Sequence, residues 1–277
     1  DFAHLWDGEW EDWGEETPEI EWLVPSIIAK GTLIWAYGDK ETAKSMYFVG
    51  LMAQMSHRGY DVAFYSEEMG RTADVRRLGR WAPDKEHFHW QNGKLLELDN
   101  EYHVARVIRE CQGFDLIVFD SYSRVWRGYG RGNRDAVNCA RVLRQIIEGT
   151  GAAVVMIDHT GFLFIDSEGN SVDMKRPRDA SAKEQQADMS ILFQSKGLWL
   201  GPPHPYYFVM TNMKPGRLEN PFRRNMEIRD TEGGGLGLFG DGLEYVGASE
   251  ALEPAGATAG VESFDSATVD PAPTFVG

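Results

Sequence analysis

The 277-residue sequence contains few cysteines and no long apolar run, and each absence excludes a class of protein. Cys111 and Cys139 are its two cysteines, too few for a disulfide framework or a cysteine-rich metal site. No stretch approaches the roughly 18 consecutive apolar residues that a membrane-spanning helix needs. The first residues also lack the charged, apolar and small-residue regions of a secretion signal. We therefore expect a protein of a reducing cytoplasm that has no membrane partner.

Basic residues are scarce at both ends of the chain, which carries a net charge of −15. A protein that neutralises phosphates normally presents excess Lys and Arg, so the total charge argues against a nucleic-acid partner. The charge is unevenly distributed, however. Residues 1–22 hold nine acidic and no basic residues, residues 227–277 hold ten acidic and one basic, and residues 23–226 hold 24 acidic and 27 basic. The middle of the chain is therefore mildly basic and compatible with nucleic acid.

Composition also divides the chain into three parts. Residues 1–22 combine acids with four tryptophans, which predicts an arm that docks on its own domain or on a neighbour. Residues 23–246 form the expected core. Residues 247–277 are rich in Ala, Gly, Thr, Ser, Pro and acids, a composition that cannot offset its ordering entropy, so we expect a disordered acidic tail.

Apolar runs rich in Val, Ile, Leu and Phe alternate with longer helix-compatible segments along the first part of the core. Strands that alternate with helices imply a parallel sheet with right-handed crossovers, so we expect a doubly wound α/β domain. The expected strands are 32–37, 61–65, 116–119 and 153–157, and the expected helices are 44–58, 72–81, 102–112 and 134–150.

After residue 188 the pattern changes to short apolar segments without intervening helices. Such a run predicts antiparallel strands that extend the sheet. The expected segments are 198–200, 206–211, 225–229 and a hairpin through 236–246 that turns at Gly240, Asp241 and Gly242.

The sequence GDKETAKS directly follows the first expected strand and precedes a helix. It fits the phosphate-binding P-loop, G-x-x-x-x-G-K-[ST], except that Ala43 replaces the second glycine. Backbone N–H groups and the helix N-terminus of such a loop form an anion cradle, its lysine reaches the terminal phosphates and its hydroxyl ligates Mg²⁺. The alternative is a lysine at a helix start that only complements nearby acids. The nucleotide-binding candidates are Gly38, Asp39, Lys40, Glu41, Thr42, Ala43, Lys44 and Ser45.

Two further features bear on this loop. Asp120 ends the buried run FDLIVFD, and an acid there faces the sheet edge where ligands of open α/β folds collect. It is a candidate metal ligand; alone, such an acid is more often a turn or cap residue. Ala43 adds a β-carbon beside the phosphates, which costs about 1 kcal/mol if the backbone needs a positive φ. We therefore expect weak or slow hydrolysis.

Five segments occur in the order seen in RecA-like ATPases: the P-loop, SEEM at 66–69, FDLIVFDS at 114–121, VVMIDHTG at 154–161 and MTNMKPGR at 210–217. Over roughly residues 23–230 the sequence resembles the phage and plasmid replication branch of that superfamily, above all RepA-like and DnaB-like hexameric helicase cores. The resemblance implies a RecA-like three-layer α/β/α domain with a mostly parallel central sheet and a C-terminal antiparallel extension. It also implies ATP and Mg²⁺ as cofactors, and a bacterial or phage-infected cell. The implied partners are single-stranded DNA, replication or repair proteins, and further copies of the chain in a ring such as a hexamer.

The resemblance assigns roles to several polar residues. Glu68 would orient the attacking water, with Glu67 as the competing candidate. Lys44 and Ser45 would bind phosphate and Mg²⁺, and Asp120 would support the metal.

Three more residues have implied roles that each compete with a structural one. His159 occupies the position of a polar residue that senses the γ-phosphate, although a lone histidine after a strand is usually structural. Lys214 and Arg217 loosely match a Lys-x-Arg pair that reaches into a neighbouring subunit's active site. Such an arginine finger makes hydrolysis depend on assembly. The alternative is a pair of basic residues at a strand end.

Two basic segments could contact nucleic acid. The first, SRVWRGYGRGNR at 123–134, interleaves arginines with aromatic residues, and the second follows His159. Cations that track phosphates beside aromatic faces that stack on bases suit single strands. A solvated arginine-rich surface is the alternative. The candidate contacts are Arg127, Arg131, Lys175, Arg176 and Arg178.

Three functions remain open from the sequence. The first is an ATP- and Mg²⁺-dependent ATPase that acts on DNA in replication, recombination or repair. The second is a metal-dependent nuclease, because Glu67, Glu68, Asp120, Asp158 and His159 all gather at one sheet edge. The third is a nucleotide-binding module that loads helicases or acts as an adaptor without hydrolysis, a role that Ala43 supports.

Overall fold

The computed structural model describes residues 19–93, 95–128, 132–159, 180–196, 204–213, 222–231 and 234–240, and the two short strands at 164–165 and 171–172. Most of the predicted arm, the whole predicted tail and the strand expected at 198–200 lie outside these residues. Trp22, the last residue of the predicted arm, belongs to the first strand and packs against the core.

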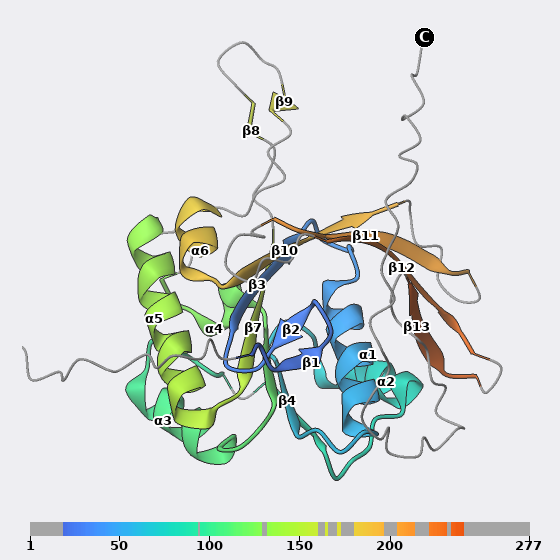
Figure 1. Cartoon of the computed structure of the whole chain (residues 1–277), viewed down its shortest axis with the longest axis horizontal. Coiled ribbons are helices and arrows are strands. Elements are labelled where there is room, and N and C mark those ends of the chain that lie inside the picture. Colours follow the sequence, from blue (N-terminus) through green and yellow to red (C-terminus); the bar gives the residue numbers. More distant parts are fainter. Residues whose placement is uncertain are drawn as a thin grey trace, which may run out of the picture.

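The described residues build one large sheet with helices on both faces (Figure 1). Its six parallel strands confirm the mostly parallel sheet that we expected, and three antiparallel strands extend it at the C-terminal end. The strand order is β13 (Leu236–Gly240), β12 (Arg223–Asp230), β11 (Tyr206–Asn212), β10 (Met189–Ser195), β3 (Leu33–Gly38), β7 (Ala153–His159), β6 (Leu116–Asp120), β4 (Val62–Ser66) and β5 (Phe88–Asn92).

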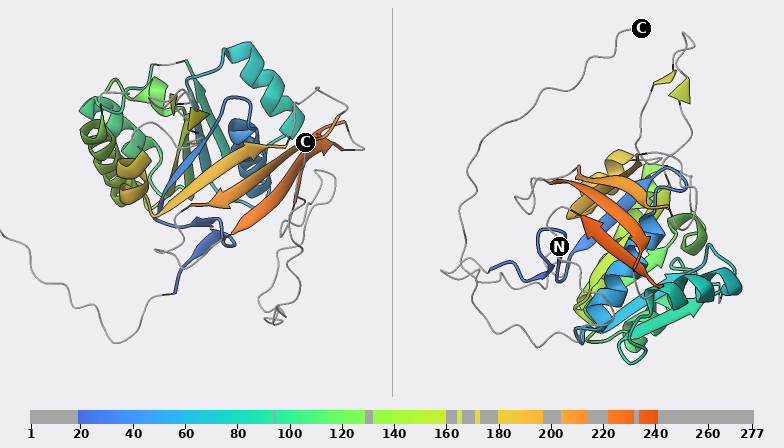
Figure 2. Two further views of the ribbon diagram at one scale, coloured as in Figure 1. Left: turned by 90° about the horizontal axis from the view of Figure 1, so that it is seen from above. Right: turned by 90° about the vertical axis from the view of Figure 1, so that its right-hand side faces the viewer.

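The helices lie in two layers, as the view from above shows (Figure 2). One face carries α1 (Lys44–Ser56) and α2 (Arg71–Trp81). The other carries α3 (Glu101–Glu110), α4 (Tyr122–Val125), α5 (Asn133–Thr150) and α6 (Ala180–Gln186). Two small antiparallel pairs complete the described chain: β1 (Trp22–Val24) with β2 (Ile28–Ala29), and β8 (Phe164–Ile165) with β9 (Ser171–Val172).

The central strand β3 divides the apolar core in two. All six of its residues are buried, and successive side chains point to opposite faces. Ile34 and Ala36 therefore pack with α1, whereas Trp35 and Tyr37 pack with the helices of the opposite face. Burial on both faces explains why this strand reads as a continuous apolar run.

Two strands depart from the expectations. β5 is a polar strand at the sheet edge with partly exposed side chains, so it lacks an apolar signature. β10 is parallel to β3, and the expected antiparallel run after residue 188 therefore begins only at β11. The expected hairpin segment at 236–240 does form a strand, but it pairs with the preceding β12. Residues beyond Gly240 lie outside the described chain.

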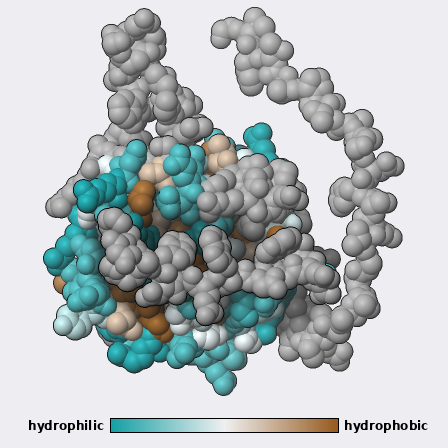
Figure 3. Space-filling view, turned by 60° about the vertical axis from the view of Figure 1, so that its left-hand side comes forward, coloured by the Kyte–Doolittle hydropathy of each residue, from teal (hydrophilic) through white to brown (hydrophobic). Residues whose placement is uncertain are grey.

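The surface gives no sign of a membrane-spanning element. None of the helices in the described residues is long and apolar enough to cross a bilayer. The face in Figure 3 is mostly hydrophilic, with small separate hydrophobic patches.

Candidate functional site

The P-loop joins the end of β3 to the start of α1, as the sequence predicts. Glu41 and Ala43 have left-handed backbone conformations, with φ of 61° and 62°. A residue with a β-carbon in this conformation costs about 1 to 2 kcal/mol. At Gly38, an added β-carbon would lie 2.4 Å from the carbonyl oxygen of Phe193, so only glycine fits. The loop is therefore tightly turned, and Ala43 occupies a position that favours glycine.

The Lys44 side chain is buried inside this loop. Its ammonium group donates hydrogen bonds to the carbonyl oxygens of Gly38 at 2.8 Å and Asp39 at 2.7 Å, and to the Thr42 hydroxyl at 3.2 Å. Burial lowers the pKa of Lys44 to about 8, although nearby carboxylates, foremost that of Asp120, oppose the shift. A desolvated cation in a cradle of backbone amides is well suited to bind phosphate.

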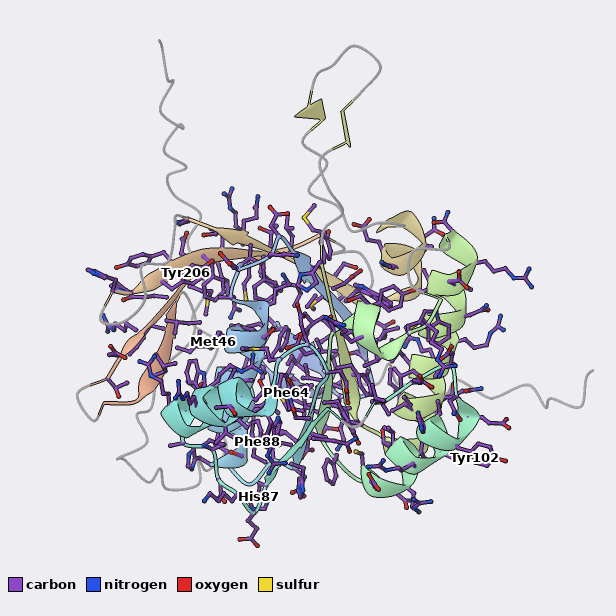
Figure 4. All side chains as sticks on the ribbon, turned by 180° about the vertical axis from the view of Figure 1, so that it is seen from behind. Met46, Phe64, His87, Phe88, Tyr102 and Tyr206 are labelled. Atoms are coloured by element: carbon purple, nitrogen blue, oxygen red, sulfur yellow. The ribbon has the colours of Figure 1, made fainter. Side chains whose placement is uncertain are left out.

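Tyr206 and a hollow flank the loop. The Tyr206 hydroxyl, on β11, donates to the carbonyl oxygen of Glu41. In Figure 4, Tyr206 lies near the start of α1, where Met46 is labelled. No motif marks Tyr206, because its partner is far away in the sequence. The hollow, of about 240 Å³, lies beside the loop and is lined by Asp39, Lys40, Thr42, Leu192, Phe193, Gln194 and Ser195.

Asp120 lies at the end of β6, at the sheet edge that carries the P-loop. It is 1% exposed, and neither of its carboxylate oxygens has a hydrogen-bond partner among the described residues. Burial raises the pKa of Asp120 to about 6, while Arg77 and the Ser45 hydroxyl act against the rise. An unpartnered carboxylate near a hydroxyl offers the hard oxygen ligands that Mg²⁺ prefers. The residues present therefore fit the predicted metal.

Glu68 and His159 form a pair at the same edge. The Nε2 atom of His159 lies 3.0 and 3.1 Å from the two carboxylate oxygens of Glu68. Because a carboxylate can only accept, Nε2 carries the proton and donates. The hydrogen bond from His159 lowers the pKa of Glu68 against the effect of burial, with smaller contributions from Ser121 and Lys44. Glu68 is therefore an ionised carboxylate held in place near the P-loop lysine.

Glu67, the competing candidate for the water-orienting role, faces elsewhere. One of its carboxylate oxygens lies 3.5 Å from the backbone nitrogen of Leu96, and its own backbone N–H donates to the carbonyl oxygen of Asp120 at 2.8 Å. The geometry thus favours Glu68 over Glu67.

Asp158 is fully buried and already has partners. Its carboxylate accepts from Lys183 at 2.6 Å and from the backbone N–H of His159 at 2.8 Å. Across the described residues, no three His, Cys, Asp or Glu side chains are grouped so that they could hold a metal ion. A nuclease built on clustered carboxylates is therefore not favoured, whereas a Mg²⁺ site completed by water and phosphate oxygens needs no such cluster.

Most of the predicted nucleic-acid contacts lie outside the described residues, namely Arg131, Lys175, Arg176 and Arg178. Arg127 is described and exposed, and its guanidinium donates to the Glu97 carboxylate. Exposed ion pairs of this kind are weak, so Arg127 could exchange its partner for a phosphate. Its DNA contact remains a prediction.

Lys214 and Arg217 also lie outside the described residues, but both ends of their segment are described. β11 runs antiparallel to β10, so Asn212 and Met213 lie at the sheet edge opposite the P-loop. There the Met213 N–H donates to Ser190, and the Asn212 N–H donates to Phe222 on the returning strand. The segment is thus anchored about one strand length from Lys44 of the same chain, roughly 15 to 20 Å.

Comparisons with known structures agree with this geometry. The solved structure of a helicase ATPase domain has a TM-score of 0.52 and 12% identity, with 73% of this chain and 83% of that chain covered. Flagellar accessory protein FlaH from Methanocaldococcus jannaschii has a TM-score of 0.50 and 12% identity, with 76% of this chain and 91% of that chain covered. At such identities the likeness concerns the fold, and it confirms the predicted RecA-like architecture.

Sequence comparison identifies the family. No curated protein matches the chain significantly. Residues 3–162, more than half of the chain, match the family model described as an AAA domain. The chain therefore belongs to this AAA domain family and is a RecA-like P-loop ATPase domain.

Proposed function

We propose that this chain is an ATP- and Mg²⁺-dependent ATPase that acts on single-stranded DNA as a homo-oligomer, in replication, recombination or repair. The observation that carries the proposal is the buried, unpartnered carboxylate of Asp120 near Ser45. A buried carboxylate without a partner is costly to maintain, which indicates that it binds a ligand. Lys44 and the Glu68–His159 pair gather at the same sheet edge.

The described residues supply the parts of a phosphoryl-transfer site. The backbone amides of the P-loop and Lys44 bind the phosphates, while Ser45 and Asp120 hold Mg²⁺, which neutralises the phosphate charge when it is bound. The Glu68 carboxylate orients the attacking water and accepts its proton. Its lowered pKa keeps it ionised at neutral pH, and His159 fixes its orientation.

Assembly supplies the remaining part of the site. Because their segment is anchored at the opposite sheet edge, Lys214 and Arg217 are suited to a neighbour's nucleotide rather than to the chain's own. A cation supplied in this way stabilises the charge of the transition state and makes turnover depend on oligomerisation.

DNA is the proposed effector because the core is mildly basic once the acidic ends are set aside. Arg127, Arg131, Lys175, Arg176 and Arg178 are the proposed contacts. Phosphate contacts by such residues are sequence-independent and sensitive to salt.

The proposal is tested by measuring ATP hydrolysis with and without single-stranded DNA, across protein concentration, for the wild type and Lys44→Ala. We expect turnover that DNA stimulates, that rises more than linearly with protein concentration and that Lys44→Ala abolishes. Turnover that is absent in the wild type while nucleotide still binds would instead select the non-hydrolysing module, which the left-handed backbone of Ala43 favours. DNA cleavage by Mg²⁺ without ATP would select the nuclease.

A further inference from the structure

A buried ion pair lies directly beneath the candidate site. The Lys183 ammonium, on α6, donates to the Asp158 carboxylate at 2.6 Å, and the side chains are 1% and 0% exposed. Replacing such a pair by apolar side chains of similar size is often neutral or stabilising, whereas removing one partner leaves an uncompensated charge. Fold stability alone is therefore a weak reason for this pair.

Aromatic rings hold the pair in a fixed arrangement. The Lys183 ammonium lies 4.5 Å from the ring centre of Tyr122 and 5.7 Å from that of Trp35. The indole Nε1 of Trp35 donates to the same oxygen of Asp158 at 3.4 Å. The position of the Asp158 carboxylate is thus fixed by groups from β3, α4 and α6.

The other oxygen of this carboxylate orients the candidate catalytic pair. It accepts the backbone N–H of His159 at 2.8 Å, and the His159 ring in turn donates to Glu68. A continuous set of hydrogen bonds therefore runs from Lys183 through Asp158 and His159 to Glu68. The chain leaves the sheet at His159 and returns to the core in α6, so the ion pair also fixes α6 to the end of β7.

We propose that Lys183 is a positioning residue for ATP hydrolysis: paired with Asp158, it holds His159 where its ring can orient the Glu68 carboxylate. The inference rests on the proposed function and adds to it a residue that contacts neither nucleotide nor metal. It predicts that loss of the ion pair lowers kcat while nucleotide affinity is retained, because Lys44 and the P-loop backbone do not depend on it.

The first test compares steady-state ATP hydrolysis and nucleotide binding for Lys183→Met and the neutral double variant Asp158→Asn/Lys183→Met. The double variant keeps the side-chain shapes without a lone buried charge, so it should fold even where the single variant does not. We expect kcat to fall about tenfold or more in both, which corresponds to about 1.4 kcal/mol, with KM within about twofold of the wild type.

A matched control is Arg144→Met. Arg144 also fastens α6, through hydrogen bonds to Asp188 at 2.7 Å and to the carbonyl oxygen of Gln186 at 3.1 Å, but it is not connected to His159. We expect this variant to retain the wild-type kcat.

The second test is a double-mutant cycle on kcat between Lys183→Met and His159→Ala. If Lys183 acts through His159, the two losses are not additive, and Lys183→Met lowers kcat little further once His159 is absent. A merely structural role gives additive losses. Wild-type kcat in the folded neutral double variant, or an additive cycle, overturns the inference while the proposed function stands. Absence of turnover in the wild type overturns both.

Discussion

The phenolic hydroxyl of Tyr206 donates a hydrogen bond to the backbone carbonyl of Glu41, in the middle of the P-loop. Glu41 has a left-handed backbone conformation, which is unfavourable for a residue with a β-carbon. The hydrogen bond thus ties a strained part of the loop to β11. The antiparallel extension of the sheet therefore contributes directly to the shape of the nucleotide cradle.

Removing this hydroxyl should weaken nucleotide binding. A hydrogen bond of this kind contributes about 0.5 to 1.5 kcal/mol, so Tyr206→Phe should reduce ATP affinity by about threefold to tenfold. Titration with a fluorescent ATP analogue measures the effect. Tyr207→Phe is the matched control, because Tyr207 is exposed on the same strand and should bind as the wild type does. Equal affinities for the Tyr206 variant and the wild type would show that the loop holds its shape without this contact.

Restoring glycine in the P-loop should relieve strain. Ala43 has a φ of 62°, so Ala43→Gly should raise the free energy of unfolding by up to about 1 kcal/mol and raise ATP affinity or turnover. Urea denaturation and steady-state hydrolysis measure the two effects.

The control for this substitution is Ala53→Gly. Ala53 is buried within α1, where glycine costs about 0.5 to 1 kcal/mol relative to alanine, so this variant should be less stable than the wild type. Opposite signs at positions 43 and 53 identify backbone conformation as the cause. If turnover in the Ala43 variant is unchanged, the alanine is not what limits hydrolysis.

Neutralising Asp120 should stabilise the protein and abolish its activity. Burial raises the pKa of Asp120 from 3.8 to about 6, a difference that corresponds to about 3 kcal/mol in favour of the neutral form in the folded state. Asp120→Asn should therefore raise the free energy of unfolding at pH 7 to 8 by up to about this amount, measured without nucleotide. Mg²⁺-dependent hydrolysis should be lost, because the carboxylate ligand is gone.

The sign of this effect depends on pH. For a carboxyl group whose pKa is raised on folding, stability is highest below the unfolded pKa and falls as pH rises through the folded pKa. The advantage of the Asn variant should thus disappear below about pH 4, where Asp120 is protonated in both states. An advantage that persists at low pH would mean that packing, not charge, separates the two proteins.

The parts of the site that the sequence predicts are those that follow strands. Asp120 and His159 end buried apolar strands, and a parallel sheet brings such ends to one edge. Tyr206 and Lys183 could not be found in this way, because they act through single contacts with partners distant in the sequence. Nothing in the local pattern marks such contacts.

The missed strand β5 has a related cause. It is a sheet edge that pairs on one side with β4, and four of its five side chains are not fully buried. A polar strand of this kind is stabilised by backbone hydrogen bonds and by its neighbour, which hydrophobic periodicity does not record.

The acidic C-terminal residues should compete with DNA for the basic core. Residues 247–277 carry five acidic and no basic residues, so their deletion should raise the affinity for single-stranded DNA by about tenfold at low salt, the lower end of electrostatic effects on association. Because salt screens exposed charges, the difference between the two chains should shrink as ionic strength rises. The control keeps the full length and replaces the five acids by Asn or Gln; it should bind as the deletion variant does if charge is the cause. Fluorescence anisotropy with a labelled oligonucleotide measures all three proteins. Equal affinities for the full and shortened chains at low salt would exclude competition by these residues.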